Sequence, residues 1–286
     1  MAHARVVNVE LNQSETCNLA DYPVKLLAEG DSWFAWSQLN LNPSSNVLRE
    51  LEFQRASIVI NYAYSGDTIR HMASICASKN FYFDVVGDRY DAILLSGGGN
   101  DLIDALYDYG ADQPLILKPA MDADAAVAES YIDSQKLDAL KAYLQANFRQ
   151  MFGYRAERNA PNRDTPVLLH TYDFPTPRNA PARFMGRPAV GPWVWRALEA
   201  IGAPPQPQVR QDICDAVFNA LADALLELDD PANHVHVVDT RNTLMRAAPG
   251  TQELSGDWIN EIHPDGYGYA LVARKLTNKL VELGIA

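Results

Sequence analysis

Short apolar runs alternate with helix-length segments along most of this chain, and this alternation limits the folds open to it. The predicted strands are residues 24–29, 57–60, 92–96, 167–170 and 234–238. Most of them are nearly continuous apolar runs, which is typical of strands buried on both faces of a parallel sheet. Helices must then cover both faces of that sheet. The pattern predicts an α/β fold, a three-layer α/β/α sandwich around a five-stranded, mostly parallel sheet.

Apolar side chains at helical spacing fill the segments between these strands. The predicted helices are residues 46–54, 68–78, 136–157, 209–228 and 266–283. Asp67 is placed to cap the N-terminus of the second helix. Because one alternation runs through the whole chain, the sequence predicts a single domain over residues 1–286.

Two insertions, at about residues 102–134 and 174–208, interrupt the alternation. The first is acidic and rich in alanine, whereas the second is rich in proline and contains Phe174, Trp193 and Trp195. Both leave the ends of predicted strands, where open α/β sheets bind their ligands. We therefore expect the insertions to shape a substrate pocket. For the proline-rich segment, a surface loop without contact to a substrate is the alternative.

Four short motifs follow predicted strands or precede a predicted helix, and they carry the residues of greatest chemical interest. They are Gly-Asp-Ser-Trp at 30–33, Ser-Gly-Asp at 65–67, Gly-Gly-Gly-Asn-Asp at 97–101 and Ile-His-Pro at 262–264. Taken singly, each motif has an ordinary structural explanation, such as a helix cap, a turn glycine or a loop histidine. Their joint occurrence in this order favours a catalytic site.

The chemistry of acyl transfer explains why these residue types belong together. A serine hydroxyl is a poor nucleophile unless an imidazole removes its proton, which suits Ser32 and His263. The tetrahedral oxyanion needs donors where its charge develops. The backbone N–H groups of Ser32 and Gly66 and the side-chain amide of Asn100 are candidates, and glycine at 66 allows a close backbone approach.

In this order the four motifs resemble those of the SGNH, or GDSL-type, hydrolases, a family of esterases, lipases and carbohydrate deacetylases. The resemblance covers about residues 24–283 and leaves the insertions unexplained. It implies a flavodoxin-like fold, with Ser32 as nucleophile, Gly66 and Asn100 as oxyanion-hole donors and His263 as general base. The Gly-x-Ser-x-Gly elbow of the α/β-hydrolases is absent around Ser32, which disfavours that family.

The sequence departs from the family pattern at the third member of the triad. The family usually places an aspartate three residues before the histidine, and this chain has Asn260 there. Asn260 could hold the tautomer of the imidazole without stabilising its charge, while Asp257 or Glu261 could supply a carboxylate. A Ser–His dyad is a further alternative. Of the two carboxylates, we predict Asp257.

Other polar and aromatic residues near the motifs are candidates for lining the pocket. These are Asp31, Trp33, Asp173 and Trp193. His234 and His236 share one face of a predicted strand, but no cluster of cysteine or carboxylate ligands accompanies them, so we expect a structural pair and no metal. The three cysteines, at 17, 76 and 214, are too widely spaced for a disulfide framework or a metal motif.

Composition excludes several classes of partner. A formal net charge of −12 without a dense basic patch argues against nucleic acids and anionic membranes. The chain has neither an apolar run of membrane-spanning length nor an apolar signal segment near its start, which predicts a cytoplasmic protein. A secreted or periplasmic protein whose signal peptide had been removed would look the same. No nucleotide-binding motif occurs, and we expect no cofactor.

The sequence thus predicts a serine esterase or lipase-type hydrolase that cleaves a small carboxylic ester through an acyl-enzyme intermediate. A carbohydrate O-deacetylase would use the same machinery, and an open, polar groove would favour it. A non-catalytic binding module that keeps the fold is the alternative from another class. The physiological substrate, the acyl-chain preference and the oligomeric state stay open.

Overall fold

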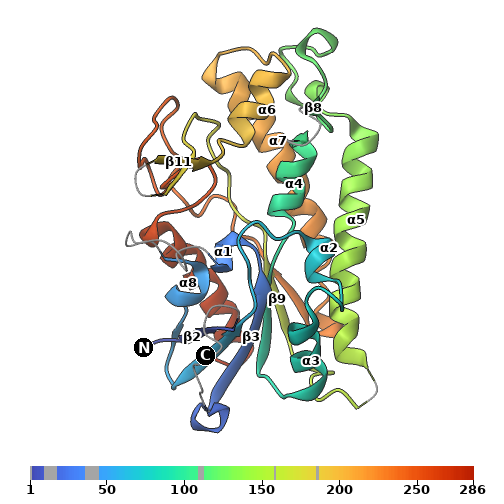
Figure 1. The fold of residues 1–286 in the computed structure, drawn as a ribbon, viewed down its shortest axis with the longest axis vertical. Helices are drawn as coiled ribbons and strands as arrows, with labels where there is room; N and C mark the ends of the chain where they lie inside the picture. Colours follow the sequence, from blue (N-terminus) through green and yellow to red (C-terminus); the bar gives the residue numbers. More distant parts are fainter. Residues whose placement is uncertain (1, 10–17, 36–44, 109–112, 158, 185–186) are drawn as a thin grey trace.

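The computed structural model describes residues 2–9, 18–35, 45–108, 113–157, 159–184 and 187–286. Its centre is a sheet of six parallel strands in the order β12-β9-β6-β3-β5-β2 (Figure 1). In chain order these strands are β2 (Arg5–Asn8), β3 (Val24–Gly30), β5 (Ser57–Asn61), β6 (Ala92–Ser96), β9 (Val167–His170) and β12 (Val235–Val238). Apart from β2 and β12, the strands are buried almost throughout, as expected for a sheet covered on both faces.

Helices cover both faces of the sheet, so the predicted three-layer sandwich is confirmed (Figure 1). On one face, α5 (Ser134–Gly153) packs against α7 (Pro207–Leu226), with α2 (Ile69–Met72) and α3 (Lys79–Gly87) beside them. On the other face, α8 (Gly266–Glu282) presents Tyr269, Val272 and Leu276 to the core at helical spacing. The Asp265 side chain accepts a hydrogen bond from the N–H of Gly268 and so fixes the start of α8.

Three expectations from the sequence need correction. The sheet has six strands and not five, because the short edge strand β2 pairs with β5. Residues 46–54 are not an α-helix but a 3₁₀ turn, Val47–Glu50, followed by β4 (Glu52–Phe53), which pairs with β1 (Ala2–His3). Residues 68–78 contain only the single turn of α2, and α3 was not predicted.

Asp67 does not cap the turn of α2 in the predicted way. The residue at the N-cap is Thr68, whose side chain makes no capping hydrogen bond. Asp67 Oδ1 instead accepts from the N–H of Thr68 at 2.8 Å and lies 2.7 Å from Nδ1 of His71. Its carboxylate therefore stabilises the start of the turn from one residue outside it.

The two insertions are built from short elements that gather beyond the carboxyl ends of the strands, at the top of Figure 1. The first contains the end of α4 (Gly99–Leu106), β7 (Tyr107–Asp108), β8 (Gln113–Pro114) and the 3₁₀ turns Ala120–Asp122 and Ala128–Tyr131. The second contains β10 (Ala182–Phe184), β11 (Arg187–Val190) and α6 (Val194–Ala200). The remaining elements are α1 (Ser32–Ala35) and the 3₁₀ turns Leu19–Asp21, Tyr154–Ala156 and Pro231–Asn233. No helix in the described ranges is long and apolar enough to span a membrane.

Candidate active site

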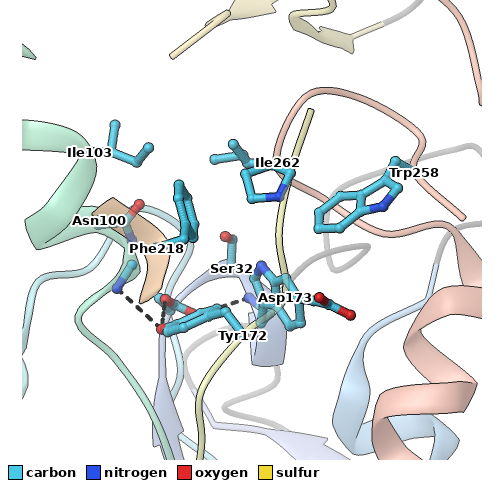
Figure 2. A pocket seen from close by; sticks show the side chains of 12 residues that line it. Ser32, Asn100, Ile103, Tyr172, Asp173, Phe218, Trp258 and Ile262 are labelled. Carbon is cyan, nitrogen blue, oxygen red and sulfur yellow. Dashed lines mark hydrogen bonds between the residues drawn. The ribbon is translucent and has the colours of Figure 1, made fainter. Parts of the chain in front are cut away.

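Ser32 lies where the strand order of the sheet reverses. The strand before it, β3, pairs with β5 on one side and β6 on the other, and such a switch point opens a crevice at the carboxyl ends of the strands. Gly30 ends β3 so close to β6 that a Cβ atom there would lie 2.8 Å from the carbonyl oxygen of Ser96. The N–H of Asp31 donates to that same oxygen at 3.0 Å. Glycine at 30 thus allows the turn to bring Ser32 to the edge of the pocket (Figure 2).

His263 connects Ser32 to Asn260. Its Nε2 lies 2.8 Å from Oγ of Ser32, and its Nδ1 lies 3.0 Å from Oδ1 of Asn260. The same Oδ1 also accepts from the backbone N–H groups of Ile262 and His263, at 3.1 and 2.9 Å. Because two N–H donors fix that atom as an oxygen, Nδ1 must carry the ring proton. Nε2 can then accept the proton of the Ser32 hydroxyl.

The burial of His263 keeps its imidazole neutral. The side chain is buried, and desolvation lowers the pKa of His263 to about 3. At neutral pH the ring therefore has an unprotonated Nε2 facing the serine. This is the protonation state that a general base requires.

Besides the N–H of Ser32, the candidate oxyanion donors are Gly66 and Asn100, which lie on two turns that are bonded to each other. Gly66 has a φ of +88°, a conformation that favours glycine, and it lies at the surface of the loop after β5. Asn100 lies in the first turn of α4, and its Nδ2 donates to the carbonyl oxygen of Asp67 at 2.8 Å. Asn100 also lines the pocket beside Ser32 (Figure 2). The hydrogen bond leaves one N–H of the Asn100 amide for another acceptor.

The two carboxylates considered for the triad have other partners. Asp257 Oδ2 accepts from the N–H of Met245 at 2.7 Å. Glu261 is buried and accepts from four backbone N–H groups, those of Arg178, Trp193, Val194 and Trp195. Among the hydrogen bonds of the described residues, the partner of Nδ1 is Asn260, and neither carboxylate takes that place. The prediction that Asp257 is the third member of the triad is corrected accordingly, because its carboxylate binds the N–H of Met245 on a neighbouring loop and not the imidazole.

Glu261 still contributes to the site by holding the loop on which Asn260 lies. Its carboxylate accepts hydrogen bonds from the first N–H groups of α6. Burial raises the pKa of Glu261 to about 7. Next to it, the buried guanidinium of Arg178 donates to the carbonyl oxygens of Trp258 and Asn260, at 3.2 and 2.7 Å. The segment from 258 to 261 is thus bonded to the second insertion along its length.

The structure brings three of the four predicted lining residues into the pocket, which Figure 2 shows from close by. Asp31, Trp33 and Asp173 line it, whereas Trp193 packs edge-on against the His263 ring at 5.6 Å between centroids. The carboxylate of Asp173 accepts from the N–H groups of Phe174, Asn242, Thr243 and Leu244. It is therefore occupied in holding two loops together.

Sequence reasoning missed most of the apolar wall of the pocket. Its members come from four segments: Ile103, Pro175, Phe218, Trp258 and Ile262. Ile103 and Pro175 belong to the two insertions, in agreement with the expectation that these shape the pocket. Phe218 belongs to the apolar stripe of α7, where nothing in the sequence distinguishes a pocket residue from a core residue. Tyr172, in the loop after β9, also lines the pocket and was missed.

Metal-binding groups are absent from the part of the chain that the structure describes, where no three side chains of the right types come together. His234 ends the 3₁₀ turn Pro231–Asn233 directly before β12, and His236 lies on that strand. Cys76 is exposed and Cys214 is buried, both as free thiols, and Cys17 lies outside the described residues.

Comparisons with known proteins give the fold. No protein-family model matches the chain, and no curated protein matches it in sequence. The lipase Lip_vut3 from a goat rumen metagenome is 15% identical, with a TM-score of 0.52 over 89% of this chain and 96% of the lipase. A possible lipase from Chitinophaga pinensis is 14% identical, with a TM-score of 0.50 over 92% of this chain and 100% of that protein. These likenesses confirm the three-layer α/β/α fold that the sequence predicts.

Proposed function

We propose that this chain is a serine hydrolase that cleaves carboxylic esters through an acyl-enzyme intermediate. The observation that carries the proposal is the chain of contacts from Ser32 Oγ through His263 to Asn260 Oδ1, at 2.8 and 3.0 Å, at the edge of a pocket. Its tautomer is the one in which histidine can accept the proton of serine. The fold, shared with lipases, is consistent with this chemistry.

In the first half of the reaction, Oγ of Ser32 bonds to the carbonyl carbon while its proton passes to Nε2 of His263. The carbonyl oxygen takes up the electron pair and is stabilised by the N–H groups of Ser32 and Gly66 and by the Asn100 amide. When the tetrahedral intermediate collapses, the bond to the alcohol oxygen breaks, and that oxygen takes the proton from Nε2. The acyl group is then bound to Ser32 and the alcohol leaves.

In the second half, His263 takes a proton from water as the water oxygen attacks the acyl carbon. Collapse of the second intermediate returns the proton to Oγ and releases the carboxylic acid. Asn260 keeps Nδ1–H bonded throughout, so the ring keeps its orientation. An amide contributes only a dipole toward the imidazolium that forms, where the usual aspartate contributes a charge.

The lining of the pocket supports an ester with an apolar acyl group of modest size. Ile103, Phe218 and Ile262 contribute aliphatic and aromatic surface near Ser32. Burial of one methylene group is worth about 0.8 kcal/mol, so such a wall favours acyl chains that reach it. A sugar, in contrast, requires polar partners along an open groove. The observed lining therefore favours a carboxylester over an acetylated carbohydrate.

Covalent labelling with a fluorophosphonate probe tests the proposal, because the probe reacts with activated serines and reports the residue it modifies. We expect the protein to be labelled at Ser32, and we expect Ser32→Ala to abolish labelling. Ser134→Ala is the matched control, since Ser134 is exposed at the start of α5. A protein that folds and is not labelled would be a binding module.

Hydrolysis assays with nitrophenyl esters of increasing acyl length and with acetylated xylo-oligosaccharides separate the two enzymatic alternatives. We expect the highest kcat/KM for a nitrophenyl ester with an acyl chain longer than acetyl. A preference for the acetylated sugars would identify a carbohydrate deacetylase instead.

A further inference from the structure

A second polar network, distinct from the Ser32–His263–Asn260 contacts, lies beneath the nucleophile. Its centre is the buried carboxylate of Asp31, the residue before Ser32. Oδ1 accepts from the N–H of Trp33 at 3.0 Å and from the hydroxyl of Ser96 at 2.8 Å. Oδ2 accepts from the hydroxyl of Tyr172 at 2.5 Å. The chemistry proposed above uses none of these groups.

The Tyr172 hydroxyl has a second partner on the other side of the site. The backbone N–H of Gly99 donates to it at 3.3 Å. Gly99 directly precedes Asn100, so one hydroxyl touches both the turn that carries the nucleophile and the turn that carries the candidate oxyanion donor. Figure 2 shows Tyr172 among the side chains that line the pocket, with these hydrogen bonds as dashed lines.

The backbone around this hydroxyl is shaped to admit it. A Cβ atom at Gly99 would lie 3.1 Å from Cζ of Tyr172 and 3.3 Å from Oδ2 of Asp31, so glycine leaves the space that the two side chains fill. Tyr172 itself has a φ of +62°, which is uncommon for any residue other than glycine, asparagine or aspartate. Backbone strain of this kind persists where the surroundings hold the residue in place.

We propose that Tyr172 is a positioning residue, whose hydroxyl sets Ser32 relative to Asn100 by joining the Asp31 carboxylate to the N-terminal turn of α4. The inference rests on the proposed function, because it concerns the geometry of attack and of the oxyanion. Tyr172 donates to Asp31 and accepts from Gly99, so it transmits position from one turn to the other through two hydrogen bonds. The carboxylate must be ionised to accept all three of its donors.

Tyr172→Phe tests the proposal, because it keeps the ring and removes only the hydroxyl. Misplacement of reacting groups by about 1 Å can cost roughly 10²-fold in rate, so we expect kcat to fall about 10- to 100-fold with KM unchanged. Tyr90→Phe is the matched control, since it removes the hydroxyl of a buried tyrosine that is bonded to Asp84 and lies just before the start of β6, away from the pocket. Wild-type kcat in Tyr172→Phe would overturn the proposal.

The pH dependence of kcat distinguishes this role from a loss of packing. Burial raises the pKa of Asp31 to about 6, and the hydrogen bond from Tyr172 works against that rise. Without the hydroxyl the pKa of Asp31 must rise further, so the acid limb of kcat should move to higher pH. Of the other titratable groups, Asp101 from α4 and Tyr269 from α8 interact electrostatically with Asp31, and His170 packs against the ring of Tyr172. If the acid limb of kcat stays at the same pH and only the maximum value of kcat falls, then Tyr172 contributes packing alone.

A double-mutant cycle with Asp31→Asn tests whether Tyr172 acts through the carboxylate. If it does, the double variant should be no slower than the slower single variant. If the fold-losses in kcat of the two single variants multiply in the double variant, the link to Asp31 is overturned. The backbone amide NMR signals of Ser32 and Asn100 report the same displacement without turnover, and we expect both to shift in Tyr172→Phe and neither to shift in Tyr90→Phe. A wild-type protein that the fluorophosphonate does not label would refute the proposed function, whereas unshifted signals would refute this inference.

Discussion

Two buried serine–histidine pairs with nearly the same geometry lie in the part of the molecule that the structure describes. In one pair, His263 Nε2 lies 2.8 Å from Ser32 Oγ, and in the other, His170 Nε2 lies 2.9 Å from Ser96 Oγ. Desolvation lowers the pKa of both histidines to about 3. Distance, burial and protonation state therefore do not distinguish a nucleophile from a structural serine in this fold.

The atom on the far side of each ring makes the difference. Nδ1 of His263 faces the acceptor Oδ1 of Asn260, so it carries the proton and Nε2 can receive one. Nδ1 of His170 faces the N–H of Tyr172 at 3.2 Å, so it must accept, and Nε2 carries the proton. His170 thus donates to Ser96, which in turn donates to Asp31. One histidine can act as a base and the other can only hold its neighbour in place.

The largest effect expected from this comparison is at the two serines. We expect Ser32→Ala to lower kcat by several orders of magnitude, roughly 10⁶-fold as in another serine hydrolase. Ser96→Ala should keep fluorophosphonate labelling of Ser32, because His170 cannot take the proton of Ser96. Activity assays and labelling of both purified variants check this. Labelling at Ser96, or more than a tenth of wild-type activity in Ser32→Ala, would break the comparison.

The partner of Nδ1 should have the next largest effect. Asn260→Ala removes the acceptor that sets the tautomer of His263, and loss of the correct tautomer costs up to about 10⁴-fold in a serine protease. We expect a loss of about 10²- to 10⁴-fold in kcat/KM, and near-wild-type values for Asp257→Asn. If Asp257→Asn alone lost as much, a carboxylate would be the third member after all.

Asn260→Asp sharpens the same point through the pH profile. A carboxylate beside Nδ1 favours the charged imidazolium, so it raises the pKa of His263. A general base with a higher pKa is lost at a higher pH as the pH falls. We therefore expect the part of the acid limb that belongs to His263 to move upward in Asn260→Asp. Asn260→Gln is a useful comparison, since it keeps an amide without adding charge.

The sequence predicts the Ser32–His263 pair and misses the Ser96–His170 pair. Ser32 belongs to a motif after a strand and His263 to a motif before a helix, where local pattern and chemistry agree. His170 and Ser96 also end strands, but their roles depend on Tyr172, whose hydroxyl meets Asp31 from 141 residues away in the chain. Asn260 presents the same problem, because only the folded loop shows whether its oxygen or that of Asp257 reaches the ring.

The fold was predictable where burial repeats along the chain. All five predicted strands are present. The helices that begin at residues 134, 207 and 266 are long enough for their apolar stripes to be unambiguous. The sixth strand, β2, is four residues long and lies at an edge, so its pattern is weak. At 46–54 the apolar spacing fits a helix, yet a 3₁₀ turn and β4 bury the same side chains.

We expect the two histidines to affect the stability of the protein in the same way, although they affect its activity differently. Each has a folded-state pKa of about 3 and an unfolded value near 6.5, so the unfolded chain binds the additional proton between these values. Below pH 6.5 each histidine should therefore cost about 1.4 kcal/mol of unfolding free energy for every pH unit, down to about pH 3. In His170→Leu and His263→Leu this cost is absent. As the pH falls, the unfolding free energy of each variant should therefore rise relative to that of the wild type by this amount per pH unit, which urea unfolding at several pH values measures. A difference in unfolding free energy that does not change with pH would contradict the buried, neutral state of the histidine.

The smallest expected effect concerns the surroundings of the two serines, because only Ser32 opens to a lined pocket. Ser96 is 1% exposed and has no room for a substrate, whereas Ser32 lies beside the apolar surface of Ile103 and Phe218. If that surface holds the acyl chain, Phe218→Ala should flatten the dependence of kcat/KM on acyl length, by up to about fourfold per methylene group, which corresponds to about 0.8 kcal/mol. Trp195→Ala is the control, since that residue belongs to the same insertion as Trp193 and does not line the pocket. Initial rates for a series of nitrophenyl esters measure the dependence. Parallel profiles for the wild type and Phe218→Ala would show that the acyl chain lies elsewhere, and a change confined to Trp195→Ala would move the acyl site to the second insertion.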